Sequence, residues 1–224
     1  MPDLSLEKAF VLSARRFGER SWIVSLFSKE HGRMSGLYRH KQAPEPATIV
    51  SARWQARLAE QLGRFSLEET KPVAARYLDD KKRLSCLVSL CALLYDFLPE
   101  NQPFPHLYQV VSDFVEQLDS ADFLKAYILL EKELLSEVGF GLDLSGCAGG
   151  GNPNDLAYIS PKTGRAVSRE KGLPYHDKLL PLPRFMWQDV PADEKEIRLG
   201  LKLTGFFLEQ HSPRHRLPES RRFL

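Results

Sequence analysis

The sequence has little cysteine and no long apolar run. Its three cysteines, Cys86, Cys91 and Cys147, are too few for a disulfide framework. No stretch approaches the roughly 18 consecutive apolar residues that a membrane-spanning helix needs. Charged residues interrupt residues 1–20, so a signal-peptide pattern is absent there as well. We therefore expect a cytoplasmic protein that has no membrane partner.

The net charge of +2 conceals an uneven distribution along the chain. Residues 1–83 carry 16 Lys and Arg against 10 Asp and Glu, whereas residues 84–160 carry 2 against 11. Residues 161–224 are basic again, with 13 against 8. A basic first third favours an anionic partner, although a solvated face without any partner would show the same balance.

Short runs of alternating polarity fill the first third of the chain. Residues 9–14, 22–27, 34–38, 49–58 and 65–67 read as five strands separated by turns. In the fourth run Trp54 lies on one face, and Arg53 and Arg57 lie on the other. Five strands in about 70 residues fit a small barrel or sandwich, of a size that includes the OB-type barrel.

The period changes to that of a helix after Leu78. Asp79 and Asp80 are suited to a helix N-terminus, and apolar residues then recur at helical spacing over residues 84–98, 107–118 and 123–138. Glycine and proline make residues 141–192 irregular, Asp193 can cap a last helix, and the basic tail from residue 213 is expected to fray. The fold class is therefore α+β, with a β domain over 1–80 and a helical domain over 81–224 that carries an irregular insert at about 141–192.

Tests for a metal site or a catalytic site find no complete set of residues. Cys86 and Cys91 point about 140° apart on a helix, and Cys147 has no CxxC partner, so neither a metal nor another cofactor is expected. Residues 5–8 match S-x-x-K and residues 162–164 match K-T-G, but the S-D-N element of the penicillin-recognising enzymes is absent. An acyl-transfer enzyme built on Ser5 and Lys162 is therefore a weak alternative.

Nucleic-acid binding has better support from the sequence. Residues 8–64 carry 11 Lys and Arg against 4 Asp and Glu. Phosphates bind to such basic stripes and bases stack on aromatic side chains. Trp22, Tyr38 and Trp54 are candidates for stacking, although large aromatic residues on alternating strands more often face the core.

Residues 18–33, GERSWIVSLFSKEHGR, carry the whole pattern G-E-x-x-x-I-V-x-x-F-[ST]-x-x-x-G-R. Together with residues 137–144 (EVGFGLDL), 155–169 (DLAYISPKTGRAVSR) and 179–183 (LLPLP), this segment resembles the RecO family of bacterial DNA repair and recombination mediators. The resemblance runs from about residue 9 to about residue 208. It implies an N-terminal five-stranded OB-fold barrel followed by a helical domain, and no hydrolytic activity.

The resemblance also implies a set of partners. RecO proteins bind single- and double-stranded DNA, anneal complementary strands, engage the acidic C-terminal tail of the single-stranded DNA-binding protein SSB and pair with RecR. Together these actions help to load RecA onto SSB-coated DNA. Two departures concern the site: the four zinc-binding cysteines of many members are reduced here to Cys147, and the basic loop of the form K-G-A-R-R corresponds to the less basic residues 38–42, YRHKQ.

The candidate site residues follow from this reading. The side chains that we expect to contact DNA are Arg15, Arg16, Arg20, Arg33, Arg39, Lys41, Arg53 and Arg57. An SSB tail needs a basic group beside an apolar groove, and Lys125 and Lys132, seven residues apart on one helical face, are the candidates for it. An RNA-binding OB module without an SSB contact and a purely structural scaffold remain as alternatives.

Overall fold

Two compact units make up the chain in the computed structural model, which describes residues 3–58 and 62–224. The first unit is formed by Met1–Glu116 together with Pro218–Leu224, and the second by Gln117–Leu217. The boundary that the sequence predicts at residue 80 marks the change from strands to helices. The compact units divide the chain elsewhere, because the first two helices pack with the barrel.

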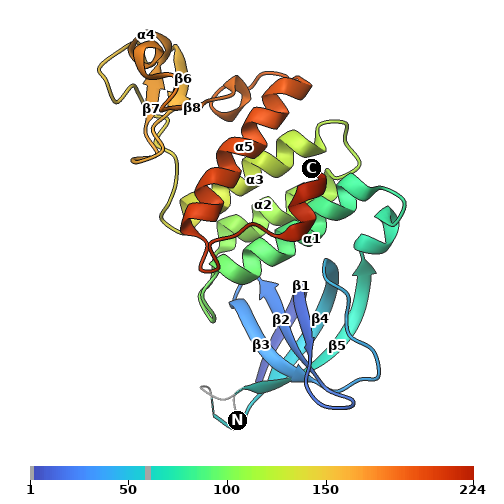
Figure 1. The fold of residues 1–224 in the computed structure, drawn as a ribbon. Coiled ribbons are helices and arrows are strands. Elements are labelled where there is room, and N and C mark those ends of the chain that lie inside the picture. Colours follow the sequence, from blue (N-terminus) through green and yellow to red (C-terminus); the bar gives the residue numbers. More distant parts are fainter. Residues whose placement is uncertain (1–2, 59–61) are drawn as a thin grey trace. The chain divides into compact units, whose positions relative to one another are not determined.

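Five strands close into a barrel in the first unit (Figure 1). They are β1 (Asp3–Arg16), β2 (Trp22–Ser28), β3 (Gly32–Tyr38), β4 (Thr48–Gln55) and β5 (Gly63–Pro72). Their order is β1-β2-β3-β5-β4, and β1 also pairs with β4, as in the Greek-key barrel of an OB fold. Register shifts in the 14-residue β1 allow it to bend and to pair along both edges. The predicted fold class is confirmed.

Two glycines allow the barrel to close between β3 and β5. Gly36 lies opposite Gly63 in this parallel pair. A Cβ atom on Gly63 would lie 2.2 Å from Cε2 of Trp54, and one on Gly36 would lie 2.6 Å from the ring of Phe65. Both rings are buried in the barrel core. The absence of side chains at these positions therefore makes room for the aromatic residues that fill this end of the barrel.

The first unit also contains helices α1 (Lys81–Phe97) and α2 (Pro105–Glu116). The carboxylate of Asp80 accepts a hydrogen bond from the backbone N–H of Arg83 at 3.0 Å, so the predicted start of the helix is confirmed. The Cys91 thiol donates to the carbonyl oxygen of Val11 at 3.5 Å, which joins α1 to the barrel, and burial raises the pKa of this thiol to about 12. Cys86 is buried as well, in agreement with the predicted core role of both thiols.

The chain returns to the first unit at its C-terminal end. A short 3-10 helix, η1 (Ala74–Tyr77), precedes α1, and another, η4 (Glu219–Phe223), packs beside it (Figure 1). The ammonium group of Lys81 lies 3.8 Å from the centre of the Phe223 ring. The expectation that the tail frays is therefore wrong, because this aromatic contact and the packing on α1 hold its last residues.

The second unit contains helices α3 (Phe123–Glu137) and α5 (Glu194–His211), which pack on each other. The fully buried Glu131 of α3 accepts a hydrogen bond from the hydroxyl of Thr204 at 2.5 Å. The side chain of Asp193 caps α5 through the backbone N–H of Glu196, as predicted. No helix in the described part of the chain is long and apolar enough to cross a membrane.

The insert between these helices is more regular than the sequence indicates. Strands β6 (Leu156–Ile159), β7 (Ala166–Ser168) and β8 (Leu180–Pro181) form an antiparallel sheet in the order β7-β6-β8. The short helices α4 (Arg169–Gly172), η2 (Leu173–Tyr175) and η3 (Arg184–Met186) complete it. Strands of two to four residues are too short to show a period, which explains why the sequence reads as irregular.

Candidate nucleic-acid interface

The ladder of the barrel gathers several chain segments at one end. Arg16 pairs with Trp22, Trp22 with Tyr38, Tyr38 with Phe65, and Phe65 with Trp54. These residues stand at or near the end of β1, the start of β2, the end of β3, the start of β5 and the end of β4. The connections that leave the barrel there therefore start beside one another, although they are far apart in the sequence.

Exposed basic side chains surround this end of the barrel. None of them forms an ion pair with any residue that the structure describes, and the only acidic residue in the connection between β1 and β2 is the exposed Glu19. We call this group the basic end of the barrel; its members are Arg15, Arg16, Arg20, Arg39, Lys41, Arg57 and Arg64. Such a concentration of exposed positive charge suits a polyanion.

Six of the eight positions that the sequence nominates for DNA contact belong to the basic end. Arg64 of β5 is the further member, one of the 11 basic residues over 8–64. It stands opposite Leu37 of β3 and Gln55 of β4, and its side chain is exposed. The alternation of β5, with Phe65 inside and Arg64 outside, is the signal that identifies it.

Arg53 already has a partner within the barrel. Its guanidinium group makes a two-point contact with the carboxylate of Asp3, including a 2.8 Å bond from Nε to Oδ1. Hydrogen bonds from Arg53 and from Gln55 lower the pKa of Asp3 to about 2. Asp3 thus occupies the Nε and Nη2 edge of the guanidinium group and neutralises part of its charge, which weakens the attraction of Arg53 for a phosphate.

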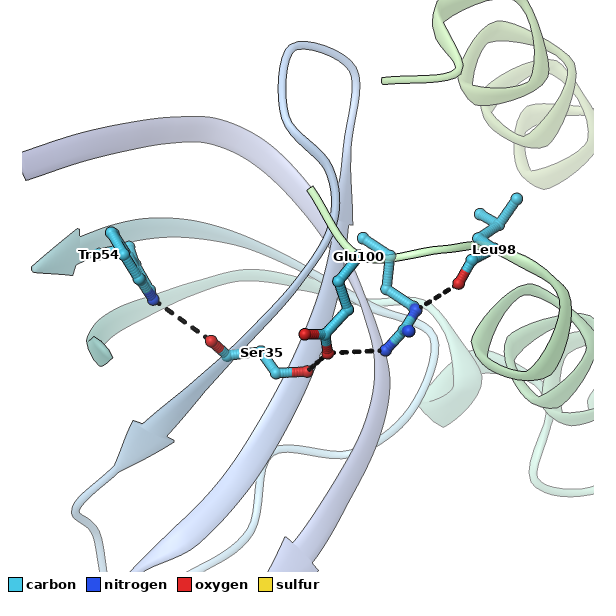
Figure 2. A network of polar contacts seen from close by, with 5 residues as sticks. Ser35, Trp54, Leu98 and Glu100 are labelled. Atoms are coloured by element: carbon cyan, nitrogen blue, oxygen red, sulfur yellow. Dashed lines mark hydrogen bonds and ion pairs between the residues drawn. The ribbon is translucent and has the colours of Figure 1, made fainter. Parts of the chain in front are cut away.

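Arg33 lies away from the basic end, near the start of β3, and its carbonyl oxygen accepts a hydrogen bond from the backbone N–H of Asn101 in the segment between α1 and α2. Figure 2 shows Leu98 and Glu100 of this segment beside Ser35 of β3. Its Nε donates to the carbonyl oxygen of Leu98 at 2.7 Å, and its Nη1 contacts Glu100 at 2.9 Å. Glu100 also accepts from the hydroxyl of Ser35 at 2.5 Å, and the ring of Tyr95 lies 5.2 Å from the guanidinium carbon. Only 15% of the Arg33 side chain is exposed. The structure therefore gives Arg33 a packing role, whereas the sequence predicts that it contacts DNA.

The aromatic residues that the sequence offers for base stacking are largely packed in the barrel. Trp54 belongs to the core, and its indole N–H donates to the carbonyl oxygen of Ser35 at 3.3 Å (Figure 2). Trp22 and Tyr38 are half-buried against that core. Phe17, in contrast, is 56% exposed at the first position after β1. Phe17 stands at a turn, outside the alternating pattern of the strands, so no pattern in the sequence identifies it.

Lys125 and Lys132 do lie on one face of α3, but both have local partners. The ammonium group of Lys125 donates to the carbonyl oxygen of Val190 at 2.8 Å, and that of Lys132 donates to the carbonyl oxygen of Met186 at 3.1 Å. Lys125 also borders a pocket of about 240 Å³ whose other lining residues are Gln117, Ser120, Asp122, Ala126 and Leu129. A basic group beside apolar side chains is thus present at Lys125, although its ammonium group also lies 3.6 Å from the carboxylate of Asp189.

The residues around Cys147 do not fit a zinc ion. Its sulfur lies 3.4 Å from the hydroxyl of Ser168 and 3.2 Å from the backbone nitrogen of the same residue. Burial raises the pKa of this thiol, but hydrogen bonds from Ser168, Gly151 and Gly149 outweigh that effect and lower it to about 7. A tetrahedral zinc site needs four ligands, and the described residues of this insert supply one thiol.

Comparison with known proteins decides the family. The chain matches the family profile "Recombination protein O N terminal" over residues 1–74 and the profile "Recombination protein O C terminal" over residues 78–221. It is 43% identical over 213 residues to the DNA repair protein RecO of Rhodospirillum centenum, a match that covers 92% of this chain and 85% of the relative. The chain belongs to the RecO family. The RecO proteins of Bartonella bacilliformis and Caulobacter vibrioides are 41% and 40% identical, and the matches cover 87% and 88% of their lengths.

Membership in the RecO family confirms several expectations from the sequence. The family consists of non-enzymatic recombination mediators, so the prediction that the chain is not an enzyme holds. In agreement, Ser5 lies inside β1 and does not start a helix, as the S-x-x-K motif would require. A role in DNA repair and recombination, with DNA and recombination proteins as partners, follows from the family.

Proposed function

We propose that the chain binds single- and double-stranded DNA through the basic end of its barrel and anneals complementary strands. The observation that carries this proposal is the set of seven exposed basic side chains, from four parts of the sequence, that surround one end of a five-stranded barrel. None of the seven forms an ion pair within the described residues, so none has to exchange a carboxylate for a phosphate.

The proposed mechanism is electrostatic. Two complementary strands repel each other through their phosphates, and a basic surface that neutralises part of this charge allows the strands to meet more often. Counterions are released when Lys and Arg replace them at the phosphates, so binding weakens as salt rises. The segment 84–160, with 2 Lys and Arg against 11 Asp and Glu, is less suited to hold the DNA backbone.

The experiment that tests DNA binding removes charge from the basic end. A variant with Arg39→Gln and Lys41→Gln should bind a single-stranded oligonucleotide more weakly, with a log K against log salt slope shallower by about 1.4, since each lost phosphate contact contributes about 0.7. Lys202→Gln, an exposed lysine of α5, is the matched control. Equal slopes for all three proteins would refute this assignment. An RNA oligonucleotide of the same sequence tests the RNA-binding alternative.

We further propose that the pocket beside Lys125 receives the acidic C-terminal tail of SSB. Its cavity of about 240 Å³ combines the Lys125 ammonium group with the apolar side chains of Ala126 and Leu129, which suits an acidic segment that ends in hydrophobic residues. Lys125→Glu should abolish binding of a fluorescent SSB-tail peptide. Lys132→Gln reports whether the second predicted lysine contributes, and unchanged binding in Lys125→Glu would contradict the proposal.

The proposed place of action is the cytoplasm, where RecR would pair with the chain and RecA would be loaded onto SSB-coated DNA. Family membership supports these partners. Annealing of SSB-coated complementary strands, measured with and without the protein at two salt concentrations, tests the combined activity. Acceleration that fades with salt is expected. No acceleration, although naked strands are bound, would mean that the SSB contact is missing or that RecR is needed for it.

A further inference from the structure

The connection between β1 and β2 presents an aromatic ring to solvent in the middle of a basic cluster. Residues 17–21 form this connection, and it is closed by a hydrogen bond from the backbone N–H of Phe17 to the carbonyl oxygen of Ser21 at 2.8 Å. The side chain of Arg16 donates to the carbonyl oxygen of Gly18 at 3.3 Å. The tip of the hairpin is therefore held by its own hydrogen bonds, and these fix the backbone from which the ring projects.

The fold does not need this ring. Phe17 is 56% exposed and belongs to no core cluster of the barrel, whereas Trp22 packs against the core one ladder pair away. The indole N–H of Trp22 is also engaged, with the carbonyl oxygen of His40 at 3.1 Å. Leaving a phenyl ring in water forgoes the stabilisation that burial would bring. A single exposed apolar side chain is common on protein surfaces, so a binding role for Phe17 depends on the charges that surround it.

The charges around Phe17 indicate the kind of partner. Arg15, Arg16 and Arg20 lie within three residues of it, all are exposed, and the loop contains one acidic residue, Glu19. A flat apolar ring next to several cations matches a ligand that carries both flat apolar faces and repeated negative charges. Single-stranded nucleic acid has this combination, because its bases expose their faces and its phosphates alternate with them. Duplex DNA hides the base faces in its own stack.

We propose that Phe17 is a base-stacking platform that gives the barrel its preference for single-stranded over duplex DNA. This inference rests on the proposed DNA-binding function and adds the residue that distinguishes the two forms. The arginines bind phosphates of either form, whereas the Phe17 ring contacts a base only where the base is unpaired. Strands held in this way present their bases apart from one another, which is the state from which annealing starts.

The test compares Phe17→Ala with the wild-type protein on three ligands of equal length: oligo(dT), an abasic oligonucleotide with the same phosphates, and a duplex. Phe17→Ala should weaken oligo(dT) binding by about 5- to 150-fold, the range for loss of one stacked base. Binding to the abasic strand and to the duplex should not change. The salt slope on oligo(dT) should stay the same, because no charge is removed.

Two further variants keep the test specific. Phe17→Trp should restore oligo(dT) binding, since the larger ring also stacks. Tyr175→Ala removes a ring of similar exposure, 59%, from the second unit and should have no effect. If the wild-type protein prefers oligo(dT) over the abasic strand and Phe17→Ala keeps that preference, the stacking role of Phe17 is refuted while DNA binding stands. An apolar protein partner then becomes the better explanation for the exposed ring. If the wild-type protein binds none of the three ligands, the proposed function itself fails, and the platform fails with it.

Discussion

Replacement of Arg33 by methionine should destabilise the first unit without changing the salt dependence of DNA binding. The side chain keeps its length in Arg33→Met but loses its charge and all of its donors. Two polar contacts are lost at once, the 2.7 Å bond to the Leu98 carbonyl oxygen and the 2.9 Å contact with Glu100, together with the stacking of the guanidinium group on Tyr95. Both join β3 to the segment that follows α1 (Figure 2).

The expected magnitude follows from these contacts. A hydrogen bond from a charged donor contributes about 1.5–3 kcal/mol. The Glu100 side chain is 45% exposed, so solvent screens its ion pair with Arg33, which adds at most about 1 kcal/mol. The total is about 1.5–4 kcal/mol. For a protein of this size 1 kcal/mol corresponds to roughly 2–4 °C, so Tm should fall by roughly 3–16 °C.

Arg39→Met is the matched comparison, because it removes the same charge from an exposed position of the basic end. Its Tm should stay within about 2 °C of the wild-type value, while the salt slope of oligo(dT) binding should become shallower by about 0.7. Binding is measured at a temperature at which circular dichroism shows all three proteins folded. A variant Arg33→Met with unchanged Tm and a shallower slope would refute the structural assignment and return Arg33 to the DNA surface.

Three other perturbations test separate parts of the chain. The pKa of the Asp3 carboxyl group, measured by NMR, should be about 2 and should return toward 3.8 in Arg53→Gln. Because folding lowers this pKa, the stabilisation of the folded protein by ionised Asp3 is complete above pH 3.8 and is lost as the pH falls through 2. Native Cys147 should be alkylated with a midpoint near pH 7, and Ser168→Ala should move that midpoint upward; a rate that rises only near pH 9 in the wild-type protein would contradict the hydrogen-bond pattern. Gly63→Ala should lower the free energy of unfolding by about 1–3 kcal/mol, since its methyl group overlaps the neighbouring indole, and an unchanged denaturation midpoint would exclude this close packing.

The sequence was sufficient for the barrel and the long helices because their patterns are regular. Alternation over residues 49–58 correctly placed Trp54 and Arg53 on opposite faces, although β4 ends at Gln55, and the acidic pair before α1 correctly marked a helix start. The small sheet of the insert could not be predicted, since strands of two to four residues show no period. The docking of the tail on α1 depends on a contact between Lys81 and Phe223, which no local pattern reveals.

Side-chain roles were harder to predict than the positions of the backbone. Charge alone could not separate an arginine that faces solvent from one that has an internal partner, since both add equally to a basic count. Arg16 and Arg33 are equivalent in that count, yet the register places the first at the barrel end and the second against Leu98 and Glu100. A partner 65 or more residues away along the chain cannot be read from spacing.

The signature that identified the family illustrates the same limit. Its final Gly-Arg pair is Gly32 and Arg33. Gly32 adopts a φ of 67°, and a Cβ atom there would lie 1.8 Å from the carbonyl oxygen of Gln102, so no other residue fits against this segment. Arg33 then binds the same segment through Leu98 and Glu100. These two residues are characteristic because they attach the barrel to the chain that links α1 and α2. A motif of this kind identifies a fold reliably but says less about a ligand. The exposed loops that are suited to DNA do not pack closely against other segments, so close packing does not restrict their residues in the same way.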